Sequence, residues 1–278
     1  MMFARFKKAA LGLASAGALA ASAQAAQMPP VPESIASQQT LRAGVRCDQP
    51  PYGYQDGTGA FAGVETDMAR QIATWIFGSP DKVEFSCVTA ENRIPQLNGR
   101  RVDLLIATLG VTPERQRVID FTIPYRWGAS GVLVHADSKF QKVAELEGHT
   151  VAMPKGSVQA KWFEDNMPGV KTLRLNTAAD SLQALKQKRA QAYAHDAATL
   201  VVVAARDKSL RMLDDPYQLS DAAIGVRKGE EQWQAYLSAA IKRMHEESLF
   251  RGWVEKAVPE ETRPYYLEVF ETARPDRK

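Results

Sequence analysis

Short apolar runs alternate with amphipathic stretches along most of the chain from residue 41 onward. The apolar runs have the length of buried strands, and the amphipathic stretches have apolar residues at helical spacing. Such alternation predicts parallel sheets with right-handed crossovers. We expect strands over 41–47, 82–90, 102–109, 130–137, 149–154, 171–176, 190–196 and 220–229, and helices over 65–77, 92–97, 112–119, 157–166, 177–189, 197–207, 230–248 and 249–258. With 278 residues, two similar α/β units fit this rhythm better than one long sheet.

The N-terminus has the three parts of a secretory signal peptide, over residues 1–25. Arg5, Lys7 and Lys8 form a positive region, residues 9–21 are small and apolar, and residues 23–25 read Ala-Gln-Ala, a cleavage signal. A membrane anchor is the alternative, but the apolar run is too short and too rich in alanine to span a bilayer. Cysteine is absent near the cleavage signal, so no lipid anchor is indicated. We therefore expect a chain exported to the periplasm.

The charge of the mature chain argues against a nucleic-acid partner. The leader contains three basic residues and no acidic ones, so its removal lowers the formal net charge from +3 to 0. Elsewhere basic and acidic residues alternate, as on an ordinary solvated surface.

The chain has two cysteines, Cys47 and Cys87, each near the end of a predicted strand. If those strands are parallel neighbours, the two side chains can meet at bonding distance. Export to an oxidising compartment favours a disulfide over the alternative, a pair of buried free thiols.

Residues 109–121, LGVTPERQRVIDF, place an arginine at an unusual position. Thr112 is a good N-cap and Pro113 suits the first helical position. Arg115 then lies beside the positive end of the helix dipole, where acidic residues are preferred. It is well placed if it binds a carboxylate or phosphate with the helix-start N–H groups. The alternative is a surface ion pair with Glu114 or Asp120.

Four segments in order resemble the signatures of the family 3 periplasmic solute-binding proteins, the polar amino-acid receptors of ABC importers: 41–73, 92–125, 148–157 and 190–200. The resemblance implies a two-lobe type II periplasmic-binding fold, with two parallel-core sheets joined by hinge strands near 131–137 and 219–226. Lobe I would comprise 39–132 plus 223–278, and lobe II 133–222. It also implies an amino-acid ligand in the cleft, a membrane permease as partner, no cofactor, and a monomer.

The resemblance assigns the ligand's main-chain groups to particular residues. Arg115 matches the arginine that binds the α-carboxylate, and Asp196 matches the aspartate that receives the α-ammonium. A plain N-cap is the alternative for Asp196. Thr108 matches a residue at the α-carbon end of the ligand. Ser157, with the glycine before it, matches a turn whose backbone donors meet the carboxylate.

The chain departs from the family pattern at several positions. Gly110 stands where serine or threonine is common, which leaves only a backbone contact. Two aromatic positions that often enclose the ligand are filled by Gln49 and Val64. Tyr52, together with Tyr125 and Trp127, is a candidate replacement, although such aromatic residues more often pack in a core.

Arg46 and Arg93 bear on the choice of ligand. Both resemble positions that carry basic side chains in the acidic amino-acid receptors of the family. Three arginines around one pocket repel one another unless anions join them, so glutamate or aspartate is the favoured ligand. Structural ion pairs are the alternative, with Asp48 or Asp67 for Arg46 and with Glu91 for Arg93.

Enzymatic function is the other class considered. The four histidines are scattered without metal-ligand spacing, and no nucleophile elbow or phosphate loop occurs, so no metal site is expected. Some exported proteins that resemble this family are cyclohexadienyl dehydratases, for which Asp196, Glu65 or Asp67 would be the candidate acid or base. Three cleft arginines favour amino-acid binding instead. A sensory ectodomain is a third reading, and no second apolar segment supports it.

Overall fold

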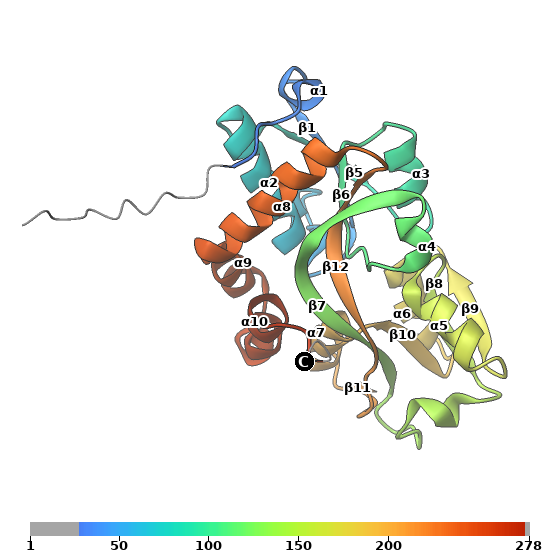
Figure 1. The fold of residues 1–278 in the computed structure, drawn as a ribbon. Coiled ribbons are helices and arrows are strands. Elements are labelled where there is room, and N and C mark those ends of the chain that lie inside the picture. The colour runs from blue at the N-terminus through green and yellow to red at the C-terminus, as the bar shows by residue number, and fades with distance from the viewer. Residues whose placement is uncertain (1–27, 276–278) are drawn as a thin grey trace, which may run out of the picture.

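A computed structural model describes residues 28–275, so the predicted signal peptide at 1–25 lies outside the described part. Its centre is a nine-stranded mixed sheet with the strand order β5-β1-β6-β12-β7-β10-β8-β9, in which β11 also pairs with β7 (Figure 1). The strands are β1 (Leu41–Val45), β5 (Val83–Cys87), β6 (Leu104–Ile106), β7 (Ile119–His135), β8 (Thr150–Pro154), β9 (Lys171–Leu175), β10 (Ala192–Asp196), β11 (Leu210–Met212) and β12 (Tyr217–Arg227). A small second sheet contains β2 (Asp48–Gln49), β3 (Gly53–Gln55) and β4 (Phe61–Ala62).

The predicted α/β fold with parallel-core strands is confirmed. Strand β1 is parallel to β5 and β6, and β8 is parallel to β9 and β10. We call the part around β1, β5 and β6 lobe I, and the part around β8, β9 and β10 lobe II. Two long strands, β7 and β12, pair with each other and run through both lobes. One continuous ladder of hydrogen bonds therefore joins what the sequence presents as two sheets.

Helices cover both lobes. They are α1 (Glu33–Ala36), α2 (Val64–Phe77), α3 (Arg93–Asn98), α4 (Pro113–Gln116), α5 (Val158–Asn166), α6 (Ala178–Lys186), α7 (Ala197–Arg206), α8 (Glu231–Glu246), α9 (Leu249–Ala257) and α10 (Arg263–Glu271), with short 3-10 turns η1 (Val143–Leu146) and η2 (Glu260–Thr262). Within residues 28–275 no helix has the length and apolar character needed to cross a membrane.

Strand β7 corrects the sequence expectation over residues 119–129. The sequence places a helix through residue 119 and a strand only from 130, whereas α4 ends at Gln116 and the strand begins at Ile119. Pro124 makes this strand hard to recognise in the sequence, because proline has no backbone N–H group to donate to a β-ladder. It is accommodated opposite Ala223, between two irregularities in the β7–β12 register.

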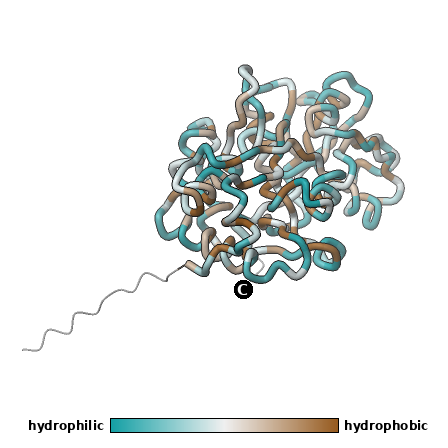
Figure 2. Tube along the Cα trace, turned by 90° about the horizontal axis from the view of Figure 1, so that it is seen from above, coloured by the Kyte–Doolittle hydropathy of each residue, from teal (hydrophilic) through white to brown (hydrophobic). Residues whose placement is uncertain are grey.

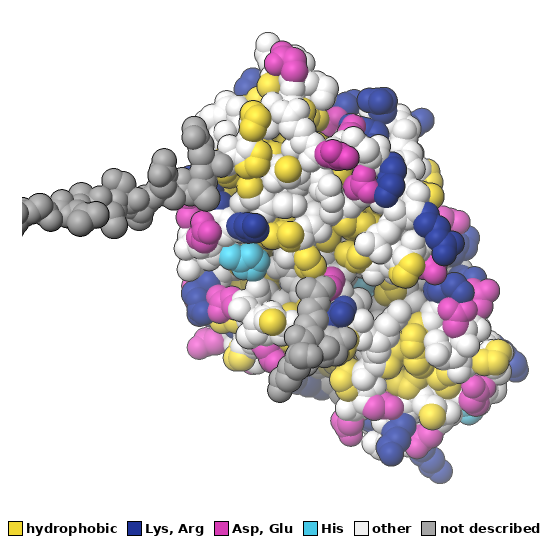
Figure 3. Space-filling model, in the orientation of Figure 1, with side chains coloured by type: hydrophobic (Ala, Val, Ile, Leu, Met, Phe, Trp, Pro, Cys, Tyr) yellow, Lys and Arg dark blue, Asp and Glu magenta, His cyan; other side chains and the backbone are white. Residues whose placement is uncertain are grey.

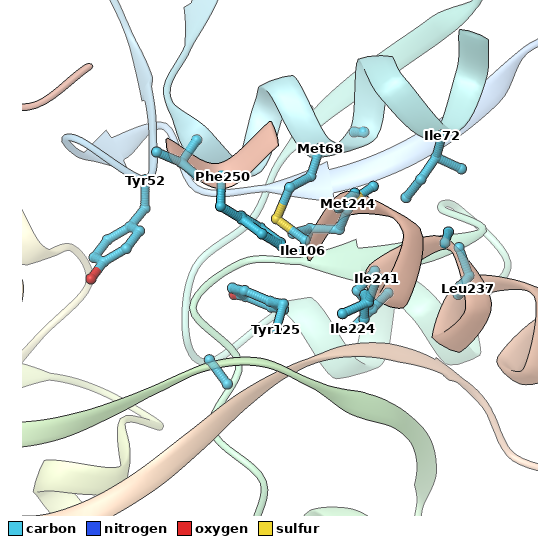
Figure 4. Close-up of a cluster of buried hydrophobic side chains, with 14 of the residues drawn as sticks. Tyr52, Met68, Ile72, Ile106, Tyr125, Ile224, Leu237, Ile241, Met244 and Phe250 are labelled. Carbon is cyan, nitrogen blue, oxygen red and sulfur yellow. The ribbon is translucent and has the colours of Figure 1, made fainter. Parts of the chain in front are cut away.

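The largest hydrophobic core lies in lobe I, where α2 and α8 pack on the sheet. Figure 4 shows Met68 and Ile72 of α2 facing Ile106, Ile224 and several residues of α8. In the hydropathy view, teal segments dominate the outer loops (Figure 2). On the face seen in Figure 3, Lys and Arg are interspersed with Asp and Glu, which agrees with the solvated surface read from the sequence.

The predicted disulfide is confirmed between Cys47 and Cys87, whose Cα atoms are 5.5 Å apart. The parallel pairing of β1 and β5 explains it, because Val45 is the register partner of Cys87. The bond fixes the loop after β1, which contains Asp48 and Gln49, to the neighbouring strand end.

Candidate functional site

A cavity lies between the lobes at the carboxyl ends of the parallel strands, where open α/β sheets bind ligands. Arg46 follows β1, Arg93 follows β5, Thr108 follows β6, and Asp196 ends β10. The lining residues come from both lobes: Arg46, Gln49, Ala90, Arg93, Thr108, Gly110, Arg115, Arg126, Pro154, Ser157, Val158, Gln159, His195, Asp196, Ser220 and Ala222. The structure thus brings together every predicted ligand-binding residue except Tyr52.

Arg115 points into this cavity rather than toward a surface acid. Thr112 caps α4 by accepting from the Arg115 backbone N–H at 3.3 Å. The guanidinium donates to the carbonyl oxygen of Gly110 at 2.7 Å and to that of Gly156, in lobe II, at 3.0 Å. Burial lowers the pKa of Arg115 to about 10. Asp120 pairs instead with Lys228 at 2.6 Å, so the surface pair considered for Asp120 does not form among the described residues.

Asp196 serves two partners at once. It ends β10 and caps α7, with Oδ1 accepting from the Ala198 N–H at 3.2 Å. Its Oδ2 lies 3.1 Å from Nη2 of Arg126, a residue of β7. Asp196 is therefore the N-cap of α7, as the alternative reading expected, and the same carboxylate also lines the cavity.

The turn before α5 brings the two lobes into close contact. Ser157 caps α5, with Oγ accepting from the Ala160 N–H at 3.1 Å. Its hydroxyl oxygen is thus in use, and the helix-start N–H groups remain the ligand donors expected at this turn. Gly156 has φ +68°, and a Cβ there would lie 2.9 Å from the Ala90 carbonyl oxygen of lobe I. Only glycine allows this approach without strain.

Thr108 and Gly110 shape the lobe I wall. The Thr108 N–H donates to Oε1 of Glu65 at 2.8 Å, and its hydroxyl lies 3.0 Å from Oε1 of Gln49. A Cβ at Gly110 would lie 3.4 Å from Nη1 of Arg115. The missing serine or threonine side chain therefore leaves room for the guanidinium. Burial is the main reason that the pKa of Glu65 is raised.

Arg46 and Arg93 differ in their partners. Arg46 is buried and pairs with Asp48 at 2.7 Å, which is the structural alternative named from the sequence. Arg93 is also buried, but Nη1 donates to the carbonyl oxygen of Ala107 at 2.7 Å. No ion pair with Glu91 or another carboxylate joins Arg93 within residues 28–275. Burial, followed by the nearby Arg115 and Arg46, places the pKa of Arg93 well below its usual range.

Tyr52 is not part of the cavity wall. Its side chain is fully buried, and its ring packs against Tyr266 and Phe270 with centroids 5.7 and 6.4 Å away. Tyr125 is likewise in the core (Figure 4), and its hydroxyl group donates a hydrogen bond to Oε1 of Glu65. The predicted aromatic replacement is therefore wrong, because these rings complete the lobe I core. Gln49 bonds to Thr199 of lobe II at 3.1 Å.

Two lining residues with ionisable side chains, His195 and Arg126, were not predicted from the sequence. His195 was one of four histidines excluded as metal ligands by their spacing, but it lies next to the end of β10, and both His195 and Asp196 line the cavity. Burial lowers the pKa of His195 to about 4, so its ring is neutral at pH 7. Arg126 was overlooked because residues 119–129 were not predicted to form a strand. Within the described residues, no group of three or more potential ligands could hold a metal ion.

Comparisons with known proteins agree on one family. Residues 41–257 match the model for bacterial extracellular solute-binding proteins, family 3. The glutamine-binding protein of Geobacillus stearothermophilus is 33% identical over 198 residues, 70% of this chain and 76% of the relative. The glutamine-binding protein GlnH of a Bacillus subtilis ABC transporter is 28% identical over 77% of this chain and 80% of its own. A solved solute receptor for L-cysteine from Neisseria gonorrhoeae is 30% identical, with TM-score 0.79, over 87% of this chain and 96% of that chain.

Proposed function

Because the chain belongs to family 3 of the bacterial extracellular solute-binding proteins, we propose that it is a periplasmic receptor for glutamate or aspartate that delivers its ligand to an ABC permease. Like its named relatives, it is a binding protein of an amino-acid transport system and not an enzyme. The alternative of a cyclohexadienyl dehydratase-like enzyme finds no support among them. The lobe boundaries at 132/133 and 222/223 belong to the same proposal.

The burial of Arg93 without a carboxylate partner among the described residues is the observation that supports an acidic ligand. A buried guanidinium without a carboxylate partner is costly, and Arg93 is 3% exposed with a backbone carbonyl as its nearest acceptor. Its Nε is buried and has no hydrogen-bond partner within the described residues. A ligand carboxylate entering the cavity supplies the missing counter-ion.

The charge balance of the cavity supports the same ligand. Four guanidinium groups line it, from Arg46, Arg93, Arg115 and Arg126. Three carboxylates face them: Asp196 in the wall, Asp48 on Arg46, and Glu65 behind Thr108. The site thus has one excess positive charge. An amino acid with a neutral side chain carries no net charge and leaves this excess in place, whereas glutamate or aspartate cancels it.

The main-chain groups of the ligand have partners across the cleft. Arg115 and the helix-start N–H groups after Gly156 would bind the α-carboxylate. Asp196 would receive the α-ammonium. Since Arg115 belongs to lobe I and Gly156 to lobe II, a bound carboxylate would connect the two lobes directly.

Closure of the lobes is part of the proposed cycle. Asp48 caps α6 across the cleft, with Oδ2 accepting from the Ala178 N–H at 2.8 Å. Gln49 of lobe I also bonds to lobe II, with its Nε2 donating a hydrogen bond to the Thr199 hydroxyl oxygen. These polar bonds between lobes accompany the closed arrangement, and opening about β7 and β12 would break them. The closed form would then dock on the permease as a monomer.

Calorimetric titration of the purified protein with glutamate, aspartate, glutamine and asparagine tests the ligand. Glutamate or aspartate should bind at least tenfold more tightly than its amide, because the amide leaves Arg93 without an anion. Arg115→Gln should weaken all four ligands alike, since it removes the grip on a group they share. Equal affinity for glutamine and glutamate would refute the acidic ligand and leave only the amino-acid class.

Export through a cleaved leader is the remaining part of the proposal. The charged, apolar, Ala-Gln-Ala order of residues 1–25 supports it. Sequencing of protein recovered from the periplasm should begin at Ala26, or at Gln27 if the adjacent bond is cut. Exported protein that retains Met1 would contradict cleavage, and an acyl chain found by mass spectrometry would contradict the soluble form.

A further inference from the structure

Arg126 occupies a position in the cleft that the amino-acid clamp does not explain. It lies in the middle of β7, opposite Ala222 of β12, and its side chain is only 2% exposed. The guanidinium stacks over the ring of Tyr52, 4.3 Å from the centroid, and pairs with Asp196 at 3.1 Å. Asp196 is therefore already paired with a cation of the protein itself.

The pair sits in a space made for it by Gly128. A Cβ at Gly128 would lie 2.7 Å from Nη1 of Arg126 and 3.4 Å from Oδ2 of Asp196. Any larger residue would push the guanidinium away from its partner. The ion pair is thus built into the hinge strand and is not a chance contact of two long side chains.

Arg126 has hydrogen-bonding capacity that remains to be filled. Nη1 of Arg126 donates to the Trp127 carbonyl oxygen at 3.2 Å, while Nε is buried without a partner within the described residues. A guanidinium offers five donors in a planar fork that matches a carboxylate. On Asp196, Oδ1 is already engaged by the N–H of Ala198.

Building on the proposed function, we propose that Arg126 is a specificity-determining residue, which selects ligands with a second carboxylate by holding Asp196 as its counter-ion. The α-ammonium of an entering ligand competes with Arg126 for Asp196. If the ammonium takes Asp196, the buried guanidinium needs another anion. A glutamate or aspartate side chain provides that anion and shares it with Arg93, which lines the same cavity.

An amino acid with an uncharged side chain binds with lower affinity for this reason. Its ammonium displaces Arg126 from Asp196, but it brings nothing to replace the lost ion pair, and an unpaired charge that is nearly inaccessible to water is unfavourable. Discrimination against amides would therefore come from a repulsive element in the empty site as well as from an attractive one in the complex.

The test compares glutamate with glutamine in the wild type and in Arg126→Gln, which keeps a planar polar group and removes the charge. Glutamate should lose at least tenfold in affinity. Glutamine should bind more tightly than it does to the wild type, because Asp196 is released for the ammonium. Arg126→Lys keeps the charge without the fork and should recover part of the preference for glutamate.

Gly128→Ala provides a second test that changes no charge. The added methyl group should force Arg126 off Asp196 and shift the ratio of the two affinities in the same direction by a smaller factor. Thermal melts of each variant show that it is folded. If the wild type prefers glutamate while Arg126→Gln and Gly128→Ala keep that ratio, the role of Arg126 is refuted and the proposed function stands. If the wild type binds glutamine as well as glutamate, both are refuted.

Discussion

The hydroxyl group of Tyr266 donates a hydrogen bond to the carbonyl oxygen of Ala198 over 2.5 Å. Tyr266 belongs to α10, near the C-terminus, and Ala198 lies two residues after Asp196 in the first turn of α7. The bond therefore ties the C-terminal helix to the element that carries the expected ammonium partner. Tyr266 is fully buried, and its ring packs against Tyr52.

The residues after α10 continue this connection along the hinge. Thr272 accepts from Nε1 of Trp127, a residue of β7, at 3.1 Å. Arg274 pairs with Asp221 of β12 at 3.5 Å. The segment lies beyond residue 257, where the match to the family model ends. It touches both strands that join the lobes, so we expect it to influence the stability of the hinge region.

Tyr266→Phe should therefore destabilise the protein by about 1 kcal/mol, the usual net value of one buried hydrogen bond. Tyr265→Phe is the matched control, because no hydrogen bond of the Tyr265 hydroxyl occurs within residues 28–275. Urea unfolding followed by circular dichroism measures both. Equal midpoints for Tyr266→Phe and the wild type would show that the bond contributes nothing to stability.

Reduction of the Cys47–Cys87 disulfide should destabilise the protein substantially. The bond closes a loop with a sequence separation of 40 residues, for which chain entropy alone corresponds to about 4 kcal/mol. The double variant Cys47→Ser/Cys87→Ser should show a similar loss in urea unfolding without reductant. Reductant should change the midpoint of the wild type but not that of the double variant. A wild-type midpoint that is insensitive to full reduction, verified by intact mass, would contradict this prediction.

Local sequence pattern predicts the parallel strands and fails at the hinge. Strands β8 and β10 were expected within a few residues of their ends, because apolar runs bounded by turns define buried strands. Strand β7 contains Asp120, Pro124 and Arg126, which break that pattern. Its extended conformation is imposed by pairing with β12 across a register irregularity, and a tertiary cause of this kind leaves no local signal.

The same distinction applies to the site. Arg46, Arg93 and Asp196 were assigned through the resemblance to the family, and the structure shows why they meet: they lie at or after the carboxyl ends of parallel strands, which share one sheet edge. Arg126 was missed because it reaches the cavity from the middle of a strand. Tyr52 was wrongly placed in the cavity because the type of a residue shows that it needs burial, but not whether the core or the ligand buries it.

His195 predicts a pH dependence of stability. Burial lowers the pKa of His195 in the folded protein to about 4, below the value near 6.5 of an exposed histidine. Between these values the unfolded chain binds the proton and the folded one does not, so the contribution of the neutral His195 to stability is fully present above pH 6.5 and is lost as the pH drops toward 4. The loss over that window is about 3 kcal/mol.

The measurement is urea unfolding of the ligand-free protein from pH 7 to pH 4. His195→Gln should lose stability less steeply with falling pH than the wild type, since it removes the proton that the unfolded chain takes up. His149→Gln, at an exposed position, should follow the wild-type profile. Parallel profiles for His195→Gln and the wild type would show that His195 does not cause the acid sensitivity.

Arg93→Met should stabilise the ligand-free protein and weaken glutamate binding at the same time. The change removes a buried cation that has no carboxylate partner within the described residues, and replaces it with an apolar side chain of similar length. Replacing buried charge by apolar groups is often stabilising, here on the order of 1 kcal/mol. The affinity for glutamate should fall at least tenfold, about 1.4 kcal/mol, because one anion-binding group is lost.

Arg42→Met is the matched control, since it makes the same substitution at an arginine outside the cavity. Arg42 donates through Nε to Oδ2 of Asp103 at 3.1 Å, and Asp103 is fully buried. Removing its partner strands a buried carboxylate and should cost about 3 kcal/mol, while glutamate affinity stays unchanged. If Arg93→Met stabilises the protein and Arg42→Met destabilises it, Arg93 serves ligand binding and Arg42 serves the stability of the fold. If Arg93→Met destabilises the protein and leaves glutamate binding intact, Arg93 is a structural residue and the acidic ligand loses its main support.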